Sequence, residues 1–405
     1  MPVHERIFIT GATGLLGGAI LHQVLSQNSR RVWRALVRGA DEAEARARLA
    51  ARLARFAGVA EAARLAARVE VVPGGLESLD TLGPEAFADV TRIVHLAADT
   101  SFTSGASSWD VNFDGTLRLA TIAARLPRLE RFLYVGTATI CGAAPPQIVR
   151  EDDYPRAGVE HLVEYTRAKA AAEFVLRERY PQLPLVVARP SIVTGHTVLG
   201  ARPSSSIFWF VRFADSVNLA PGSETCHMDI VPSDWTAQAL IELLFKPELS
   251  WRTYHVSAGE ASRSSWRGLA DAFDALRGDA GPKRLFEVFA PERLDVLKAR
   301  VAGHPEYQGR MGKLILRAAQ RYYRFCQLDV TFDNSRLLAE GIPAPPSLAS
   351  YLDVCLANPP GQSIMDAFMD DAEMCLDIVD GGSRSPSSHG ENLRMARRGP
   401  RLAAV

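Results

Sequence analysis

The sequence predicts an α/β fold, in which a doubly wound, mostly parallel sheet is joined by a smaller, mainly helical C-terminal subdomain. Three observations support this fold class. Short β-rich runs alternate with helical patterns through the first half of the chain, as in successive βαβ units. These runs are continuously apolar, which is typical of parallel strands buried on both faces. After Gly200 the sequence becomes aromatic-rich and then mainly helical.

Six strands are expected in the first half of the chain. They lie at residues 7–9, 32–37, 69–72, 93–96, 132–135 and 185–188. Helices are expected between them because apolar residues recur at helical spacing or because Ala, Arg and Glu dominate. One helix opens at residues 19–21, and the others span residues 41–67, 109–124 and 163–180. Two further strands, at residues 227–232 and 254–257, are expected to return to the same sheet.

Composition narrows the possible function classes. The 405 residues include 46 Lys and Arg and 46 Asp and Glu, which argues against a nucleic-acid binder that works by neutralising phosphates. Five cysteines lie at wide spacings without a CxxC pair, which argues against a zinc site or a disulfide framework. The N-terminus lacks a signal-peptide region, and no apolar run reaches the roughly 18 residues of a membrane helix. We therefore expect a soluble, cytoplasmic protein without a metal.

A glycine-rich turn follows the first strand. The segment TGATGLLG places Gly11, Gly14 and Gly17 at GxxGxxG spacing, directly before the first helix. Glycines there allow a tight turn and a close approach of the backbone to a pyrophosphate, and the helix N-terminus supplies free N–H groups. The sequence therefore predicts the phosphate-binding turn of a Rossmann-type domain.

The end of the second strand indicates which dinucleotide is bound. An acidic residue at this point binds the ribose hydroxyls of NAD, whereas this chain has Arg38 after Leu36 and Val37. A guanidinium suits the 2′-phosphate of NADP. Arg48 lies ten residues further on and is a second candidate, although Arg46 and Arg52 crowd the same helix. We expect NADPH as the cofactor.

These signals divide the chain into three expected parts. Residues 1–200 form an NADP-binding Rossmann domain, to which residues 226–258 return. Residues 201–360 form a mostly helical, substrate-binding subdomain. Residues 361–405 form a C-terminal extension, which is expected to be disordered from about residue 380 because Gly, Ser, Pro and Arg dominate there.

A YxxxK spacing falls on one of the predicted helices. Tyr165 and Lys169 are four residues apart, so their side chains share one helical face. We expect the lysine cation to lower the pKa of the tyrosine, which then exchanges a proton with a carbonyl or alcohol oxygen. Thr137 follows the fifth strand at the edge where open α/β sheets form their sites, and its hydroxyl is expected to bind the same oxygen. Thr139 is the competing, more structural candidate.

The ordered motifs resemble those of the extended short-chain dehydrogenase/reductases. They span about residues 7–260 and read TGATGLLG, HLAA, VNFDGT, YVGTATICG, YTRAK and ARPSIVTG. Within that superfamily the chain is most similar to the thioester reductase group, with its male-sterility-type NAD(P)-binding domain. This group includes the reductase domains of carboxylic acid reductases and nonribosomal synthetases, and the fatty acyl-CoA reductases. Thr137 instead of Ser, the segment DIVPSD at residues 229–234 and, more loosely, LDVTFDNSR at residues 328–336 favour this group.

The resemblance implies a role for each matching residue. The cofactor residues would be Gly11, Thr13, Gly14, Leu15, Leu16 and Gly17 at the pyrophosphate, Arg38 and Arg48 at the 2′-phosphate, Leu76 at the adenine, Ala97, Ala98 and Asp99 near the ribose, Tyr165 and Lys169 at the nicotinamide ribose, and Ser191 near the nicotinamide. Thr137, Tyr165 and Lys169 would be the catalytic set. One position departs from the pattern: Gly75 stands where the family has an Asp that contacts the adenine amino group.

The resemblance favours an NADPH-dependent reductase that converts an acyl thioester to an aldehyde and, with a second hydride, to an alcohol. The thioester donor, coenzyme A or an acyl carrier protein, stays open, as do the acyl chain and the oligomeric state. The aromatic residues at 208–210 and Phe213 fit either an apolar acyl pocket or ordinary core packing. The alternative functions are another extended short-chain reductase, epimerase or dehydratase that acts on a ketone, a hydroxysteroid or a nucleotide sugar, and a non-catalytic NADP-binding protein.

Overall fold

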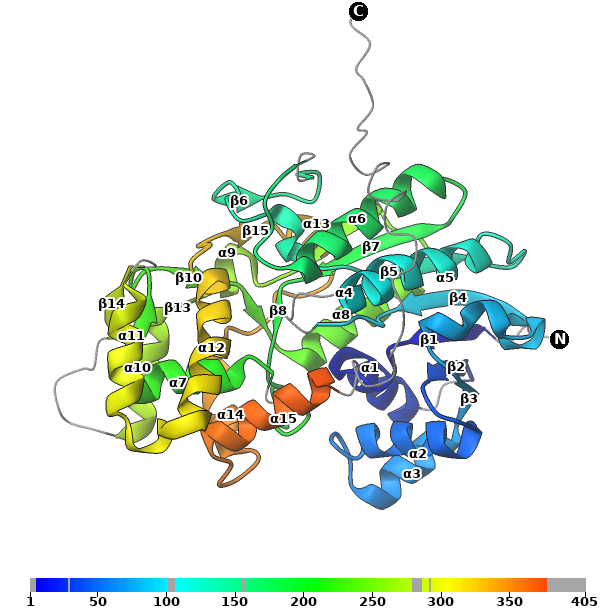
Figure 1. The fold of residues 1–405 in the computed structure, drawn as a ribbon. Coiled ribbons are helices and arrows are strands. Elements are labelled where there is room, and N and C mark those ends of the chain that lie inside the picture. The colour runs from blue at the N-terminus through cyan, green and yellow to red at the C-terminus, as the bar shows by residue number, and fades with distance from the viewer. Residues whose placement is uncertain are drawn as a thin grey trace, which may run out of the picture.

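The sheet and its flanking helices form one side of the molecule, and a helical part lies beyond the carboxyl ends of the central strands (Figure 1). The expected tail from about residue 380 lies outside the residues that the structure describes. This computed structural model describes residues 5–27, 30–100, 106–154, 158–204, 206–278, 286–290 and 293–376.

Seven parallel strands form the central sheet, in the order β12-β7-β5-β4-β1-β2-β3. From β1 the chain moves outward through β2 to β3 and then crosses back to β4. The direction of winding therefore changes between β1 and β4, which is where open α/β sheets bind ligands. The predicted fold class is confirmed. The strands are β1 (Arg6–Thr10), β2 (Val32–Val37), β3 (Val69–Pro73), β4 (Val90–His95), β5 (Arg131–Val135), β7 (Leu185–Pro190) and β12 (Thr253–Val256).

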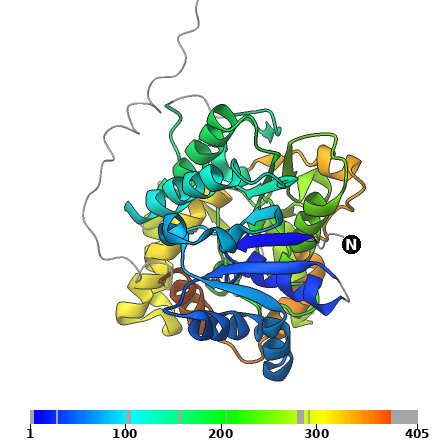
Figure 2. The same ribbon diagram turned by 90° about the vertical axis from the view of Figure 1, so that its right-hand side faces the viewer.

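Helices cover both faces of the sheet. Alternate strand residues point to opposite faces, so Ile7 and Ile9 belong to one buried cluster and Phe8 to the other. The first cluster includes residues of α1, α2, α3 and α8, and the second includes residues of α5 and α6. Figure 2 shows the strands between these two groups of helices. The helices are α1 (Leu15–Ser26), α2 (Glu42–Leu53), α3 (Val59–Ala67), α5 (Thr116–Ala123), α6 (Glu164–Arg179) and α8 (Ser233–Phe245).

Two of the expected helices are interrupted. The helix expected at residues 41–67 is divided into α2 and α3, because Gly58 caps the start of the second helix. The helix expected at residues 109–124 begins as α4 (Ala106–Trp109) and passes through a π-helical turn, Asp110–Gly115, before α5. Short 3₁₀ turns occur at Leu76–Thr81, Pro84–Phe87, Ala138–Cys141, Pro305–Tyr307 and Leu348–Tyr351.

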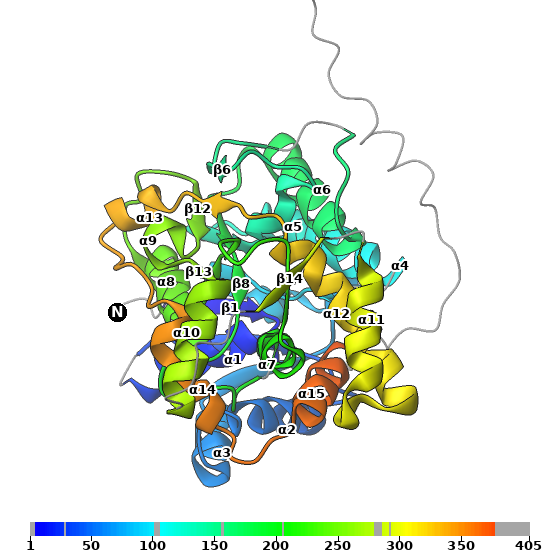
Figure 3. The ribbon, with the colours of Figure 1, turned by 90° about the vertical axis from the view of Figure 1, so that its left-hand side faces the viewer.

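The helical part has its own aromatic core. Trp209, Phe210 and Phe213 of α7 are completely buried and pack with Trp266 and Tyr323. The structure therefore favours core packing for this aromatic segment. Figure 3 shows this part in front of the sheet. The helices are α7 (Phe208–Val217), α9 (Gly259–Ser262), α10 (Trp266–Arg277), α11 (Leu294–Gly303), α12 (Gly309–Cys326), α13 (Ser335–Ala339), α14 (Leu352–Ala357) and α15 (Ile364–Leu376).

Eight short strands form four separate pairs outside the main sheet. The segment at residues 227–232, expected in the main sheet, forms β10 and β11, which pair with β13 and β8 instead. That expectation was wrong, whereas the strand expected at residues 254–257 is β12 of the main sheet. The pairs are β8 (Ile192–Val193) with β11 (Ile230–Val231), β10 (His227–Met228) with β13 (Ser264–Ser265), β9 (Leu219–Pro221) with β14 (Glu287–Phe289) and β6 (Ile148–Val149) with β15 (Thr331–Phe332).

Within the described ranges, no helix combines the length and the apolar character that a membrane crossing requires. The same ranges hold no group of three or more His, Cys, Asp or Glu side chains arranged to bind a metal ion. Cys141, Cys226, Cys326 and Cys355 are free thiols.

Candidate active site

The glycine turn between β1 and α1 has the shape of a phosphate cradle. Gly11 has a φ of +72°, and a Cβ there would lie 2.6 Å from the backbone nitrogen of Ala97. A Cβ on Gly17 would overlap the carbonyl oxygen of Gly11. Gly14 is exposed at the N-cap of α1 and offers no side-chain cap. The first N–H groups of α1 therefore have no capping side chain, and the turn fits a dinucleotide pyrophosphate.

Arg52 supports this turn from α2. Its Nε donates to the carbonyl oxygen of Gly14 at 3.0 Å, and its Nη1 donates to that of Pro203 at 3.0 Å. Burial lowers the pKa of Arg52 to about 10, so the guanidinium stays charged at neutral pH. Sequence reasoning named Arg52 only as a neighbour of Arg48, because nothing in the local pattern reveals partners 38 and 151 residues away.

The residues proposed to bind the 2′-phosphate lie at the carboxyl end of β2. Arg38 follows the last residue of β2 and is half-buried, as is Arg48 on α2. A Cβ on Gly39 would lie 2.7 Å from the backbone nitrogen of Ala45, so the start of α2 packs directly against the residue after Arg38. Arg48 lies one helical turn beyond Ala45, on the same face of α2.

Buried polar residues fix the loop after β4. The ring nitrogens of His95 are hydrogen-bonded to Thr10 Oγ1 at 2.7 Å and Thr116 Oγ1 at 2.9 Å. Burial, with a smaller effect of the Lys169 charge, lowers the pKa of His95 to about 3, so the imidazole is neutral. The backbone N–H of Ala97 donates to Thr10 Oγ1 at 3.2 Å. The edge at which Ala97, Ala98 and Asp99 were expected to meet the ribose is therefore rigidly held.

Asn112 holds the next residue of that loop and was missed by sequence reasoning. Its Oδ1 accepts from the backbone N–H of Asp99 at 3.0 Å, and its Nδ2 donates to the Asp99 carbonyl at 2.9 Å. Asn112 is completely buried and lies in the π-helical turn, a feature that is frequent at functional sites. The VNFDGT segment was the only signal for it.

The expected adenine-contact region lies after β3. Leu76 is buried, and a Cβ on Gly115 would lie 2.7 Å from its Cδ1. At Gly75 a Cβ would overlap the carboxylate of Glu77. The side chain of Glu77 thus takes up the space that an Asp at position 75 would need.

Thr137, Tyr165 and Lys169 come together at the carboxyl end of β5. Thr137 caps the 3₁₀ turn that follows the strand, and the Tyr165 hydroxyl is hydrogen-bonded to its side chain. Thr139 supports Thr137, because their hydroxyl oxygens are 2.8 Å apart. Lys169 is 1% exposed, and its Nζ donates to the Val135 carbonyl at 3.0 Å. Two hydroxyl groups and one amine therefore lie together at the carboxyl end of β5.

The pKa of Tyr165 differs from the sequence-based expectation. Burial raises it to about 12, although the hydrogen bond with Thr137 opposes this. Burial also lowers the pKa of Lys169 to about 7, so the amine loses charge near neutral pH and the expected lowering of the tyrosine pKa does not occur. The expectation was wrong because it counted the attraction between the two groups and neglected their desolvation. The phenol keeps its proton throughout the physiological range, as a proton donor must.

Ser191 and Asp229 flank the end of β7. Ser191 follows Pro190, and its backbone N–H donates to the Val256 carbonyl of β12 at 3.1 Å. Asp229 Oδ1 accepts from the backbone N–H of Ala258 at 2.7 Å. Burial raises the pKa of Asp229 to about 6. The DIVPSD segment therefore stabilises the strand ends beside the residue expected near the nicotinamide.

A buried ion pair fastens α6, which carries Tyr165 and Lys169, to β7. Arg189 and Glu173 are almost completely buried. Arg189 Nη2 lies 2.7 Å from Glu173 Oε1, and its Nε lies 3.0 Å from Oε2. Arg189 Nη1 also donates to the Glu151 carbonyl at 3.1 Å. Because Tyr165, Lys169 and Glu173 succeed one another at intervals of four residues, this pair anchors the same face of α6 that carries the candidate catalytic groups.

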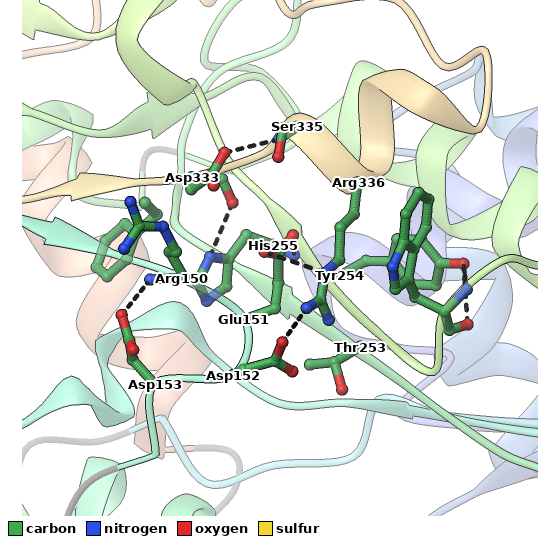
Figure 4. A network of polar contacts seen from close by, with 12 residues as sticks. Arg150, Glu151, Asp152, Asp153, Thr253, Tyr254, His255, Asp333, Ser335 and Arg336 are labelled. Atoms are coloured by element: carbon green, nitrogen blue, oxygen red, sulfur yellow. Dashed lines mark hydrogen bonds and ion pairs between the residues drawn. The ribbon is translucent and has the colours of Figure 1, made fainter.

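Arg189 also contacts Glu151 and His255 and so joins the ion pair to a polar network between β12 and the start of α13. Figure 4 shows this network. His255 Nδ1 is hydrogen-bonded to the Asp333 carbonyl at 3.0 Å. Arg336 lies 3.6 Å from Glu151 and is also paired with Asp152. This network connects the segment after β6 and the C-terminal part of the chain to the strand beside β7. No motif in the sequence predicted this network.

Comparison with known families identifies the chain. A family described as male sterility protein matches residues 9–240, more than half of the chain. The chain belongs to the male sterility protein family. The predicted resemblance to this family is confirmed, and the matched region is an NAD(P)-binding domain.

Two longer proteins are similar to this male sterility family member. It is 26% identical over 276 residues to the non-canonical nonribosomal peptide synthetase hkm10 of Aspergillus hancockii, a match that covers 62% of this chain and 26% of that protein. It is 25% identical over 273 residues to the aldehyde reductase lnaA of Aspergillus flavus, covering 62% and 25%. The chain thus spans about a quarter of the length of these relatives.

A solved structure supports the fold. The terminal R domain of the myxalamid polyketide and nonribosomal peptide pathway matches with a TM-score of 0.71 at 23% identity, covering 88% of this chain and 90% of that domain. At this identity the match establishes the shared fold of the male sterility family member and that reductase domain.

The affinity for NADPH is expected to fall as the pH rises above neutrality. Below about pH 7 the Lys169 amine is already protonated in the free protein, so this group adds no pH dependence to the affinity there. We expect the anionic dinucleotide to bind beside Lys169, so above this pH its binding would have to restore the proton and Kd should rise by up to about tenfold per pH unit. Fluorescence titration between about pH 6.5 and 9 measures this change, with Lys169→Arg as the control that stays charged. A constant wild-type Kd across this range would show that Lys169 does not face the cofactor.

Proposed function

We propose that this male sterility family member uses NADPH to reduce an acyl thioester to an aldehyde and, with a second hydride, to an alcohol. The single observation that carries the proposal is the hydrogen-bonded pair of hydroxyls from Thr137 and Tyr165, with the buried amine of Lys169 beside them. Two adjacent hydroxyl donors suit an oxygen that gains negative charge during reduction. The fold shared with a nonribosomal reductase domain and the family membership support a thioester as the substrate.

The chain's own groups would act in the following order. Thr137 and Tyr165 would donate hydrogen bonds to the thioester carbonyl oxygen and polarise it. When bound, NADPH supplies the hydride that this carbonyl carbon accepts. Tyr165 would then give its proton to the oxygen, with Lys169 as the proton-exchanging group behind it. Loss of the O–H proton and cleavage of the C–S bond would release the aldehyde and a thiol, so that one NADPH and one proton are consumed for each thiol released.

The structural elements around the site support this order. Arg52, Asn112 and the neutral His95 hold the cofactor-binding loops, and none of them is needed as an acid or a base. The Arg189–Glu173 pair keeps α6 in register with β7. Preorganised donors of this kind need little rearrangement during the reaction.

NADPH is expected to bind much more tightly than NADH, because Arg38 and Arg48 would pair with the 2′-phosphate. Arg38→Ala should weaken NADPH binding by about 1.5–3 kcal/mol, or roughly 10- to 150-fold, and leave NADH binding unchanged. Equilibrium titration of both dinucleotides tests this. Arg64→Ala, which removes an exposed arginine of α3, is the matched control. Equal wild-type affinities for the two dinucleotides would exclude the proposed role of Arg38.

A substrate panel tests the proposed reaction itself. NADPH oxidation is followed with acyl-CoA esters, the corresponding aldehydes, ketones and a nucleotide sugar. We expect turnover of thioesters with release of one thiol per NADPH. Turnover of a ketone or a nucleotide sugar without thiol release would favour the alternative functions of the extended short-chain reductases.

A further inference from the structure

One surface helix carries only positive charge. The exposed face of α12 presents Arg310, Lys313, Arg317, Arg321 and Arg324. The helix contains no Asp or Glu, although the whole chain has 46 acidic and 46 basic residues. These five side chains recur at intervals of three and four residues, so they form one continuous stripe. We call it the α12 basic face.

The stripe is not neutralised within the described residues. No ion pair or side-chain hydrogen bond joins any of its five cations to another described side chain, whereas nearby arginines are paired: Arg277 with Asp215, Arg293 with Asp295 and Arg300 with Glu287. Like charges three or four residues apart destabilise a helix by about 0.2–0.5 kcal/mol per pair, and cations in its first turn oppose the helix dipole. The α12 basic face therefore lowers the stability of the chain, with no compensating contact among the described residues.

The opposite face of α12 packs in the core of the helical part. Ile315, Ala319 and Tyr323 are buried, and the ring of Tyr323 lies 5.0 Å from that of Phe210. Among the described side chains of α12, Leu314 is the one exposed large apolar residue, at 37% exposure. A helix that binds a membrane surface must insert an apolar face, and the described exposed side chains of α12 do not form one.

The C-terminal end of α12 leads towards the candidate active site. Val330 and Phe332, a few residues after the helix, pack with Ala138 in one small buried cluster. Ala138 follows Thr137 directly in the chain. A partner seated on the α12 basic face is therefore held near the turn that carries the candidate oxyanion donor.

We propose that the α12 basic face docks an acidic carrier protein whose prosthetic arm delivers the acyl thioester; this rests on the function proposed above. Between Arg310 and Arg324 the helix rises about 21 Å, at 1.5 Å per residue. This is longer than the phosphates of one coenzyme A molecule span, and it suits an acidic helix of a protein. Complementary charge of this kind mainly accelerates association and is screened by salt.

The test compares one acyl group on three donors. Dodecanoyl thioesters of an acidic acyl carrier protein, of coenzyme A and of pantetheine are offered to the wild type and to Arg317→Gln/Arg321→Gln/Arg324→Gln. We expect kcat/KM for the carrier-bound substrate to fall at least thirtyfold, through KM, and to lose most of its salt dependence. Dodecanoyl-pantetheine should be reduced within about twofold of the wild-type rate. The control variant Arg64→Gln/Arg118→Gln/Arg128→Gln changes net charge equally at solvent-accessible arginines outside α12 and should behave like the wild type.

Other outcomes overturn the proposal. Equal kcat/KM for the carrier-bound substrate in the wild type and the α12 variant would do so. A second contrary outcome is binding of the wild type to phosphatidylglycerol vesicles that the α12 variant loses, while the variant keeps normal kinetics with the carrier-bound substrate. That result would assign the α12 basic face to a membrane surface. Failure of the proposed reaction is distinguished by the absence of wild-type turnover on dodecanoyl-pantetheine. If that turnover is absent, docking is still measured by fluorescence anisotropy of the labelled carrier protein. An unchanged Kd for the carrier protein in the α12 variant would then contradict the docking proposal.

Discussion

Replacing Tyr165 by phenylalanine is expected to lower reductive turnover at least a hundredfold. The change removes the hydroxyl that is hydrogen-bonded to Thr137 and, in the proposed mechanism, the proton that reaches the substrate oxygen. A hundredfold loss corresponds to about 2.7 kcal/mol of transition-state stabilisation. NADPH binding should survive, because the phenol is a minor part of the cofactor site. Steady-state kinetics and NADPH titration of the same preparation measure both quantities.

The matched control for this variant is Tyr180→Phe. Tyr180 follows α6, about 22 Å along the helix axis from Tyr165 at 1.5 Å per residue, and its hydroxyl is hydrogen-bonded to Thr121 at 2.8 Å. Loss of that hydroxyl should leave turnover nearly unchanged. Near-normal turnover of the Tyr165→Phe protein would refute the assignment and leave Thr137 as the main candidate donor. A pH profile adds a second check, because the pKa of Tyr165 near 12 predicts that its own deprotonation does not limit turnover below about pH 10.

Arg189→Met is expected to destabilise the fold by about 3–5 kcal/mol. The substitution leaves the Glu173 carboxylate buried beside an apolar side chain, and a buried charge without its partner is costly. Arg177 lies 3.0 Å from Glu173 but is 26% exposed, so it compensates only in part. Equilibrium urea unfolding measures the loss as a lower midpoint. The free energy of unfolding of native proteins is only about 5–15 kcal/mol, so this loss would remove a large part of it.

The double variant Glu173→Leu/Arg189→Met serves as the control. It removes both charges, so it should be more stable than Arg189→Met alone. If the single variant fails to fold, recovery of folded protein in the double variant still tests the explanation. A single variant with wild-type stability would mean that the pair does not anchor α6.

The sheet was largely predictable from the sequence, because parallel strands buried on both faces are continuous apolar runs. All six expected strands of the first half are present at nearly the expected positions. The sheet to which residues 227–232 belong was predicted wrongly, because two short apolar strands can pair with any available strand edge. Their partners, β8 and β13, are themselves only two residues long. The break between α2 and α3 was missed because Ala, Arg and Glu continue on both sides of it.

The candidate site was predictable where chemistry is local in sequence. The glycine turn and the YxxxK pair each lie within eight residues, and the structure brings Tyr165 and Lys169 to Thr137 as expected. The supporting groups were not predictable, because their partners are distant: Arg52 contacts Pro203, and Arg336 contacts Glu151. Desolvation also depends on the whole fold, which is why the direction of the Tyr165 pKa shift was wrong.

One measurement tests the central claim most directly. The wild-type protein is incubated with dodecanoyl-CoA and NADPH carrying deuterium in the transferred position, and NADPH consumption, thiol release and the aldehyde are followed together. The proposed function predicts one thiol released for each NADPH consumed in forming the aldehyde, with deuterium on the carbon that was the thioester carbonyl. Consumption of NADPH without thiol release, or a product without deuterium at that carbon, would contradict thioester reduction by this site.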